Sequence, residues 1–306
     1  MKLGIFIGCF CLFLSCSDDK IDIPTDGGPV RLSMTVSGFS DFETYIRSLI
    51  VYAFRQEESG EYFYYKVLAD LDAAGIRQLE SASSGGGNGE VKWLNTELPP
   101  GNYRLFLAGN VRPQGEPEVG VSKPEDLRLI YPREGLFWSY FLGQGDVKAE
   151  GTAVSVSIEL KRAVSRLFVK LSGIPWQIDR ITLSLRGVAG EIGLDGTLFS
   201  ASVVEETFQM KNEDVYLQDT VLFDVFSFPS VGKSSALNFI FYSKSGEERI
   251  KTVEISLLPD KYLYLTGEVN EEEGGLLTYS ISFIFLLVLD WVDIQLPDFS
   301  LKPVEK

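Results

Sequence analysis

The chain has 306 residues, 45% hydrophobic and 12% aromatic, which is enough apolar material for a large core and excludes global disorder. Its formal net charge of −15 argues against nucleic acid as a partner, because binding phosphates needs a basic face. The sequence has no histidine, which excludes Ser-His-Asp catalysis, Cys-His catalysis and His-ligated zinc.

The first residues have the pattern of an export signal. Met1 and Lys2 precede an apolar run over residues 3–14, which is shorter than the roughly 20 residues that span a bilayer. Small Ser15 then precedes Cys16, and this resembles a bacterial lipobox, with Phe13 where Leu is usual. We predict a lipoprotein signal peptide over residues 1–15, cleavage between Ser15 and Cys16, and a lipid on Cys16.

Two alternatives to this cleavage remain open. Cys9 follows the small Gly8, but cleavage there would leave an apolar segment on the mature protein, and an ordinary secretory signal cut nearby is the other reading. The three cysteines are Cys9, Cys11 and Cys16. Cleavage before Cys16 would therefore leave no disulfide, thiolate cluster or catalytic thiol in the folded body. We expect no catalytic residue, no metal site and no cofactor.

The residues after Cys16 are acidic. Ser17, Asp18 and Asp19 resemble the signal that follows the lipidated cysteine in Bacteroidetes lipoproteins carried to the outer cell surface. We predict that these residues direct surface export. They are equally typical of a solvated tether, and residues 16–29 are predicted to form a flexible acidic one. The two interpretations are compatible.

The first half of the remaining chain predicts β-strands. Leu32, Met34 and Val36 alternate with polar residues, as in a strand with one buried face. Further predicted elements are a more fully buried strand (47–54), its hairpin partner (61–68), a short helix (within 70–82), a strand launched by a Pro-Gly turn (98–110) and a long irregular connection (111–135).

The pattern breaks and restarts near Lys161 to Ala163. One alternating strand ends there and another begins, so we predict a β-sandwich domain over 30–162 and a second over 163–306. Short strands bounded by turn residues follow, which indicates a sandwich rather than alternating β and α units: 179–188, 222–228, 236–244, 247–258 and 262–269.

The most apolar run outside the signal is 281–291. Asp290 and Asp293 interrupt it before it reaches membrane-spanning length. It predicts a buried central strand, and the alternative is a carboxy-terminal strand that pairs with another subunit.

The order of these segments resembles the FimB family of fimbrial anchor subunits, in the wider fimbrillin group of Bacteroidetes. The matching pieces are "LSCSDD", "LIVYAF", "LPPGNYRLFLAGN", "LFWSYFLGQGDV", the junction "VSIELKRAVSRLFVKLSGI" and the terminal "DW". The resemblance implies an all-β protein of two tandem transthyretin-like, Greek-key sandwich domains. It also implies a non-enzymatic anchor or minor subunit of a fimbria, which pairs a β-strand with a fimbrial shaft subunit and sits in the outer membrane through Cys16.

Polymerising relatives are cleaved after an arginine near the amino terminus. Arg31 and Arg47 are the candidates by position, but cleavage would detach an anchor from Cys16, so no cleavage site is carried over.

Two other functions are weighed. The first is a glycan-binding surface lipoprotein of a polysaccharide-uptake system, in which Trp93, Trp138 and Tyr140 would stack on sugar rings. The simpler interpretation is that these side chains lie in the core or at the domain junction. A glycosidase would need two carboxylates across a cleft, but pairs such as Glu205-Glu206 look like solvated loops. Asp195 alone does not supply the spacing of a calcium loop.

Overall fold

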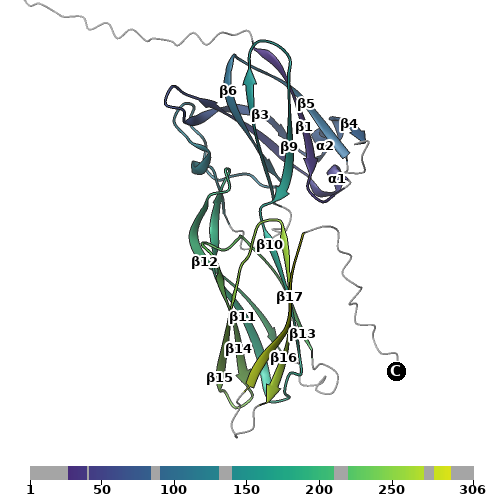
Figure 1. Cartoon of the computed structure of the whole chain (residues 1–306), viewed down its shortest axis with the longest axis vertical. Coiled ribbons are helices and arrows are strands. Elements are labelled where there is room, and N and C mark those ends of the chain that lie inside the picture. The colour runs from purple at the N-terminus through teal and green to yellow at the C-terminus, as the bar shows by residue number, and fades with distance from the viewer. Residues whose placement is uncertain are drawn as a thin grey trace, which may run out of the picture.

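The computed structural model describes residues 27–39, 41–83, 90–130, 140–209, 220–271 and 279–290. Its regular structure is almost entirely β-strand, which confirms the predicted all-β class. The strands gather in two lobes that are stacked along the long axis of the molecule (Figure 1).

The first lobe contains β1 (Gly28–Val36), β2 (Leu49–Gln56), β3 (Tyr62–Leu71), β4 (Glu80–Ser83), β5 (Glu90–Leu98), β6 (Gly101–Gly109), β8 (Phe141–Ala149) and β9 (Val154–Arg162). Its helices are α1 (Phe42–Tyr45), α2 (Ala73–Gln78) and the 3-10 turn η1 (Pro124–Asp126). The second lobe contains β10 (Ser165–Ser172), β11 (Ile178–Gly193), β12 (Leu198–Gln209), β13 (Val221–Ser227), β14 (Ser235–Ser243), β15 (Glu248–Ile255), β16 (Lys261–Glu271) and β17 (Tyr279–Asp290). A short strand from the first half, β7 (Arg128–Ile130), pairs with β11.

The strands of the first lobe follow the order β3-β2-β6-β8-β9-β1-β5-β4. The corner between β8 and β9 depends on small residues, because a Cβ on Gly143 or Gly145 would lie 2.8 Å from the side chain of Ile158. With glycine at both positions, Ile158 packs over β8. The core then lies between the β9-β1-β5 part and the β2-β6-β8 part, and includes Leu32 and Leu105.

Strand β2 is buried on both faces, as its continuous apolar run predicts. Val51 and Ala53 face the core between the two parts of the sheet. On the opposite face, Tyr52 and Phe54 join a second apolar cluster that includes Leu127 from the 111–130 connection. This connection was predicted as irregular, and it also contains η1 and β7. It covers the outer face of β2 and β6.

The second lobe has two facing sheets, with strand orders β13-β10-β16-β17 and β12-β11-β14-β15. Strand β14 alternates strictly between buried and partly buried residues, as expected for a strand with one face toward solvent. Buried residues such as Leu183, Phe223 and Phe239 fill the space between the sheets.

The apolar run at 281–291 does not form a central strand, so that prediction is wrong. Within the described residues, β17 pairs with β16 and stands at the edge of its sheet. A run of apolar residues predicts that both faces of a strand are buried. It does not predict whether the strand is paired on both sides or lies at the edge of its sheet. No helix among the described residues is both long enough and apolar enough to cross a membrane.

Candidate functional site

The predicted lipidation and export residues, Ser15, Cys16, Ser17, Asp18 and Asp19, lie outside the described residues. The structure describes where the chain that follows them joins the fold. Gly28 begins β1, and a Cβ added there would lie 2.9 Å from Cα of Gly151 in the β8–β9 turn. The chain therefore enters the first lobe at the end that carries this turn.

The other end of β1 reaches the junction between the lobes. The N–H of Ser37 donates to the carbonyl oxygen of Leu160 on β9 (2.8 Å). Strand β9 ends at Arg162, and β10 begins at Ser165. Figure 1 shows β9 pointing toward the second lobe. The ends of β1 and β9 thus lie together where the second lobe begins.

A strand pairing crosses this junction. Residues 128–130 of β7 pair with residues 191–193 of β11. The Arg128 guanidinium bonds to the Glu191 carboxylate (2.8 Å) and lies 4.0 Å from the ring centroid of Phe199. The N–H of Leu194 donates to the carbonyl oxygen of Leu127 (3.1 Å). The 111–130 connection therefore joins the lobes through its backbone as well as covering β2.

Apolar packing is also continuous across the junction. Leu129 and Val164 lie in the same buried cluster as Ala189, Ile192 and Phe228 of the second lobe, and this cluster continues into the core of the first lobe. Separating the lobes would expose these side chains to water, at about 25 cal/mol for each Å² of apolar surface.

Arg162 is buried at the junction, with 3% of its surface exposed. Its guanidinium lies 4.2 Å from the ring centroid of Phe39 and 5.2 Å from that of Phe141. Desolvated cation–π contacts of this kind stabilise by roughly 2 kcal/mol. The arginine at the end of β9 is thus a structural cation, held between aromatic rings.

Asp260 faces this arginine from the turn before β16. Its backbone has a φ of +57°, and its N–H donates to the carbonyl oxygen of Val164 (3.0 Å). Burial raises the pKa of the Asp260 carboxyl to about 6, although the charge of Arg162, hydrogen bonds from Ser37 and the Arg162 backbone, and the charge of Lys161 all oppose the rise. Asp260 is therefore ionised at neutral pH at some cost to stability.

A cleft of about 680 Å³ opens beside the junction. One wall comes from β8 and β9 and the other from the β11–β12 turn, with Pro229 and Pro259 completing it. The charged residues in its lining are Glu159, Lys161, Arg162 and Asp195. These side chains give the cleft charges of both signs.

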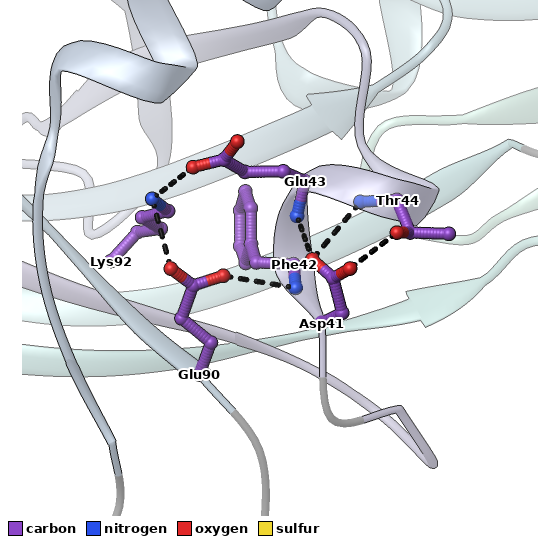
Figure 2. Close-up of polar contacts among 6 residues, drawn as sticks. All are labelled: Asp41, Phe42, Glu43, Thr44, Glu90 and Lys92. Atoms are coloured by element: carbon purple, nitrogen blue, oxygen red, sulfur yellow. Dashed lines mark hydrogen bonds and ion pairs between the residues drawn. The ribbon is translucent and has the colours of Figure 1, made fainter.

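A second polar cluster lies in the first lobe (Figure 2). The ammonium of Lys92, a residue only 1% exposed, bonds to Glu43 (2.6 Å) and Glu90 (3.0 Å). Burial alone would lower the pKa of Lys92, but the two carboxylates outweigh it and raise the pKa. The Glu90 carboxylate also accepts from the N–H of Phe42 (3.3 Å), and Asp41 caps α1.

This Lys92 cluster attaches α1 to β5. All three charged groups have partners, which makes the cluster a structural lock rather than a reactive site. No group of three or more His, Cys, Asp or Glu side chains suited to a metal ion occurs in the part of the chain that the structure describes.

The chain matches the Mfa2 family profile, described as fimbrillin-A associated anchor proteins Mfa1 and Mfa2, over residues 22–282. The chain belongs to the Mfa2 family. This confirms the predicted resemblance to fimbrial anchor subunits, and it supports a fimbrial anchor or adhesin role that involves other fimbrial subunits. The family is one of structural anchor proteins and not a family of enzymes.

Solved structures show the same fold. The fimbrial anchor protein Mfa2 of Porphyromonas gingivalis matches with a TM-score of 0.54 and 16% identity, over 86% of this chain and 98% of that one. A candidate adhesin of Bacteroides ovatus matches with a TM-score of 0.54 and 12% identity, over 87% and 96%. A candidate polysaccharide-binding protein of Bacteroides thetaiotaomicron matches with a TM-score of 0.51 and 16% identity, over 79% and 92%. No curated protein sequence matches the chain.

The structure describes two of the three aromatic residues considered for glycan stacking, Trp93 and Tyr140. The Arg31 guanidinium lies 4.2 Å from the ring centroid of Trp93, and Tyr140 packs against the first-lobe core. Trp138 lies outside the described residues. Sequence reasoning missed Trp176, which is 65% exposed near the Lys244 ammonium (5.4 Å).

The acidic pair Glu205-Glu206 was predicted in a solvated loop; both residues are exposed, but the loop is wrong. Both residues lie in β12, where Glu205 accepts from the hydroxyl of Ser184 (2.9 Å). Burial and the nearby charge of Asp224 raise the pKa of Glu206. Asp195 accepts from the N–H of Thr197 (3.0 Å), which accounts for it as a turn residue.

Proposed function

We propose that this chain is an outer-membrane lipoprotein that anchors a fimbria at the cell surface. A lipid on Cys16 holds it to the membrane, and a β-strand pairing joins it to the neighbouring shaft subunit. The match to the Mfa2 anchor family over residues 22–282 carries this proposal. In it, residues 1–15 are the signal, 16–29 the tether, and 30–162 and 163–306 two tandem sandwich domains.

The position of β1 supports this orientation. Strand β1 begins at the end of the first lobe that is farther from the second lobe, because it runs parallel to β9 and β9 leads into β10. Cys16 precedes Gly28 by twelve residues (28 − 16), which span at most about 40 Å when fully extended. A lipid on Cys16 would hold the first lobe near the membrane and present the second lobe outward.

Among the described residues, the sheet edges of the second lobe are β12, β13, β15 and β17. Strands β12 and β13 contact each other, which leaves β15 and β17 as the more open edges. Strand β15 exposes Arg249 and Lys251, and charges on an edge discourage pairing with another chain. The sequence of β17 is apolar from Phe283 to Leu289. This contrast favours β17 as the edge at which a neighbouring subunit adds a strand.

The lipid anchor is tested by Cys16→Ala in cells that assemble fimbriae. The variant should not incorporate labelled fatty acid, and its fimbriae should appear in the medium instead of on the cells. Cys9→Ala is the matched control and should behave as wild type. Labelling that survives Cys16→Ala but is lost in Cys9→Ala would move the anchor to the alternative site. Fimbriae unchanged in amount, length and attachment in cells that lack the gene would refute anchoring itself.

Strand pairing is tested by hydrogen exchange on the purified chain, with and without its shaft subunit. The amides of β17 should become protected in the complex, while those of β15 should exchange as before. Protection confined to β15 would place the pairing on the other edge. A complex that protects neither edge would remove strand pairing from the proposal and leave family membership untouched.

Glycan binding is the second candidate, favoured by the exposure of Trp176 and by the shared fold with a candidate polysaccharide-binding protein. An exposed aromatic face suits stacking on a sugar ring. A glycan array probed with the wild type and with Trp176→Ala tests it. Binding that Trp176→Ala abolishes would support it, and absence of binding by a folded protein would dispose of it.

A further inference from the structure

Strand β1 lies in the interior of its sheet, with a neighbour on each side. Residues 28–34 pair with β5 in antiparallel fashion, and residues 30–36 pair with β9 in parallel fashion. A parallel partner is unusual in this otherwise mostly antiparallel lobe. The first strand that the tether reaches is therefore paired on both sides, rather than a loose edge.

The parallel pairing fixes how β1 would respond to tension. Because β1 and β9 run in the same direction, β1 begins at the far end of the first lobe, while β9 ends at the junction and continues into β10. If Gly28 is pulled away from the second lobe while β10 is pulled in the opposite direction, β1 slides along β9. Sliding loads all seven register pairs of this ladder together, from Val30–Val154 to Val36–Leu160. Two neighbouring ends of an antiparallel hairpin would instead separate one bond at a time.

Side chains oppose the same sliding movement. Leu32 and Met34 are completely buried in the core, and a slip of one residue would turn them toward the opposite face. The Ser33 hydroxyl donates to the carbonyl oxygen of Val156 on β9 (3.3 Å). On the other side, Arg31 forms an ion pair with Glu80 of β4 (2.9 Å).

The junction end of the β1–β9 pair leads directly into the second lobe. The N–H of Ser37 extends the ladder by donating to the carbonyl oxygen of Leu160 (2.8 Å), and the N–H of Asp260, from the second lobe, donates to the carbonyl oxygen of Val164 (3.0 Å). The Ser165 hydroxyl, at the start of β10, donates to the carbonyl oxygen of Leu258 (2.6 Å). The second lobe then repeats the arrangement, because β10 pairs with β16 in parallel. Tension that leaves the first lobe thus enters a second parallel pair.

We propose that the β1–β9 pair is a mechanical clamp, which carries tension between the tether and the second lobe in shear and opens in one step. The proposal rests on the proposed function, since an anchor held at its amino-terminal end is loaded in this direction. It predicts that the load path runs from β1 across the ladder to β9, and that the rest of the first lobe is spared until this ladder breaks.

Single-molecule force spectroscopy tests the clamp. The chain from Ser17 to Lys306 carries one handle at its amino terminus and a second on a thiol introduced by Ser245→Cys, in the exposed β14–β15 turn. We expect the first lobe to open in a single event that releases its whole length. A staircase of small steps beginning at low force would overturn the proposal, because it would show β1 peeling away.

A disulfide staple tests the load path directly. Arg31 and Ser155 are exposed register partners on β1 and β9, and Arg31→Cys/Ser155→Cys should join the two strands. With the staple oxidised, tension passes from β1 to β9 through the disulfide, so the first-lobe event should disappear. The event should return when the staple in the same molecule is reduced, which also shows that the variant folds.

The matched control staples a pair outside the path. Asn102 and Lys148 are exposed register partners on β6 and β8. Oxidised Asn102→Cys/Lys148→Cys should keep the first-lobe event at the same force and shorten the released length. Loss of the event in this control, or its persistence with the β1–β9 staple, would refute the clamp. Neither measurement involves a lipid or a fimbria, so its outcome is independent of the Cys16→Ala test.

Discussion

The two lobes share a strand plan but are packed differently. Each has a parallel pair, β1–β9 in the first lobe and β10–β16 in the second. The second lobe has a two-layer apolar core. The first lobe adds a third layer over β2 and β6, and it buries the Lys92 ammonium against two carboxylates.

This difference explains why strands of the two lobes have different sequences. Strand β14 alternates because its outer face meets water, and residues such as Asn238 and Tyr242 can therefore be polar there. The outer face of β2 meets the 111–130 connection, so Tyr52 and Phe54 are buried on that face as well. A covered sheet needs apolar residues on both faces, and the covering segment is a long loop rather than a helix.

The largest expected effect tests whether residues in the third layer contribute as much to the free energy of unfolding as residues in the core of the second lobe. Phe54 in that layer and Phe239 in the second lobe are both fully buried. Phe54→Ala and Phe239→Ala should each lower the free energy of unfolding by about 3–5 kcal/mol, through lost burial and a residual cavity. Urea unfolding measures both, with Ile250→Ala, at an exposed site, as a nearly neutral control. A cost for Phe54→Ala close to that of the control would show a loosely packed third layer.

The next effect separates a buried ion cluster from a more exposed one. Glu43→Gln with Glu90→Gln leaves the Lys92 ammonium buried without a carboxylate and should cost about 3 kcal/mol at neutral pH. In the second lobe, Asp224→Asn removes the partner of the Arg166 guanidinium (2.6 Å) from a site that is 40% exposed, and it should cost about 1 kcal/mol or less.

The pH dependence of the Lys92 cluster provides a further check. The pKa of Lys92 is raised from 10.5 in the folded state, so the stabilisation is present below 10.5 and is lost as the pH rises through the higher folded value. The difference between the wild type and the double Gln variant should therefore shrink in alkali. A difference that stays constant from pH 7 to pH 11 would show that lost packing, and not charge, causes the destabilisation.

The last effect concerns the junction and has the opposite sign. The pKa of Asp260 is about 6 in the folded state against 3.8 in the unfolded state, so the ionised carboxylate destabilises the fold above pH 6 and the penalty disappears as the pH falls toward 3.8. Asp260→Asn should raise the free energy of unfolding by up to about 3 kcal/mol at pH 8. Asparagine also tolerates the positive φ at this position. A gain that is the same at pH 4 would rule out titration as its cause.

The sequence predicted the elements whose side chains follow a clear period. Leu32, Met34 and Val36 marked β1, and the continuous apolar run of β2 predicted burial on both faces. The turn before β6 and the restart after Arg162 were also placed correctly. In each case the face that the sequence pattern marks as apolar is the face that tertiary contacts bury, so the pattern predicts the strand correctly.

The missed elements have patterns that tertiary contacts override. Strand β12 carries Ser, Glu and Thr and is paired along one side by β11, so its sequence looks like a loop. Strand β7 has three residues and exists because β11 lies beside it. Nothing local to β5 reveals that Lys92 is buried, because its partner Glu43 comes from α1. The lipidation residues remain predictions from the sequence alone.

The pairing of β7 with β11 bears on how far this protein is modular. A fragment that begins after Arg162 would leave behind β7 and the 111–130 connection, and with them the partners of Glu191 and Ile192. A fragment that stops there would keep Leu129 but lose the second-lobe residues that cover it, such as Phe228. Each fragment would expose unpaired backbone or apolar side chains that the other half covers in the intact chain. The boundary that is visible in the sequence is therefore a poor place to cut, and exchange of lobes between relatives would have to carry the 111–130 connection along with the second half.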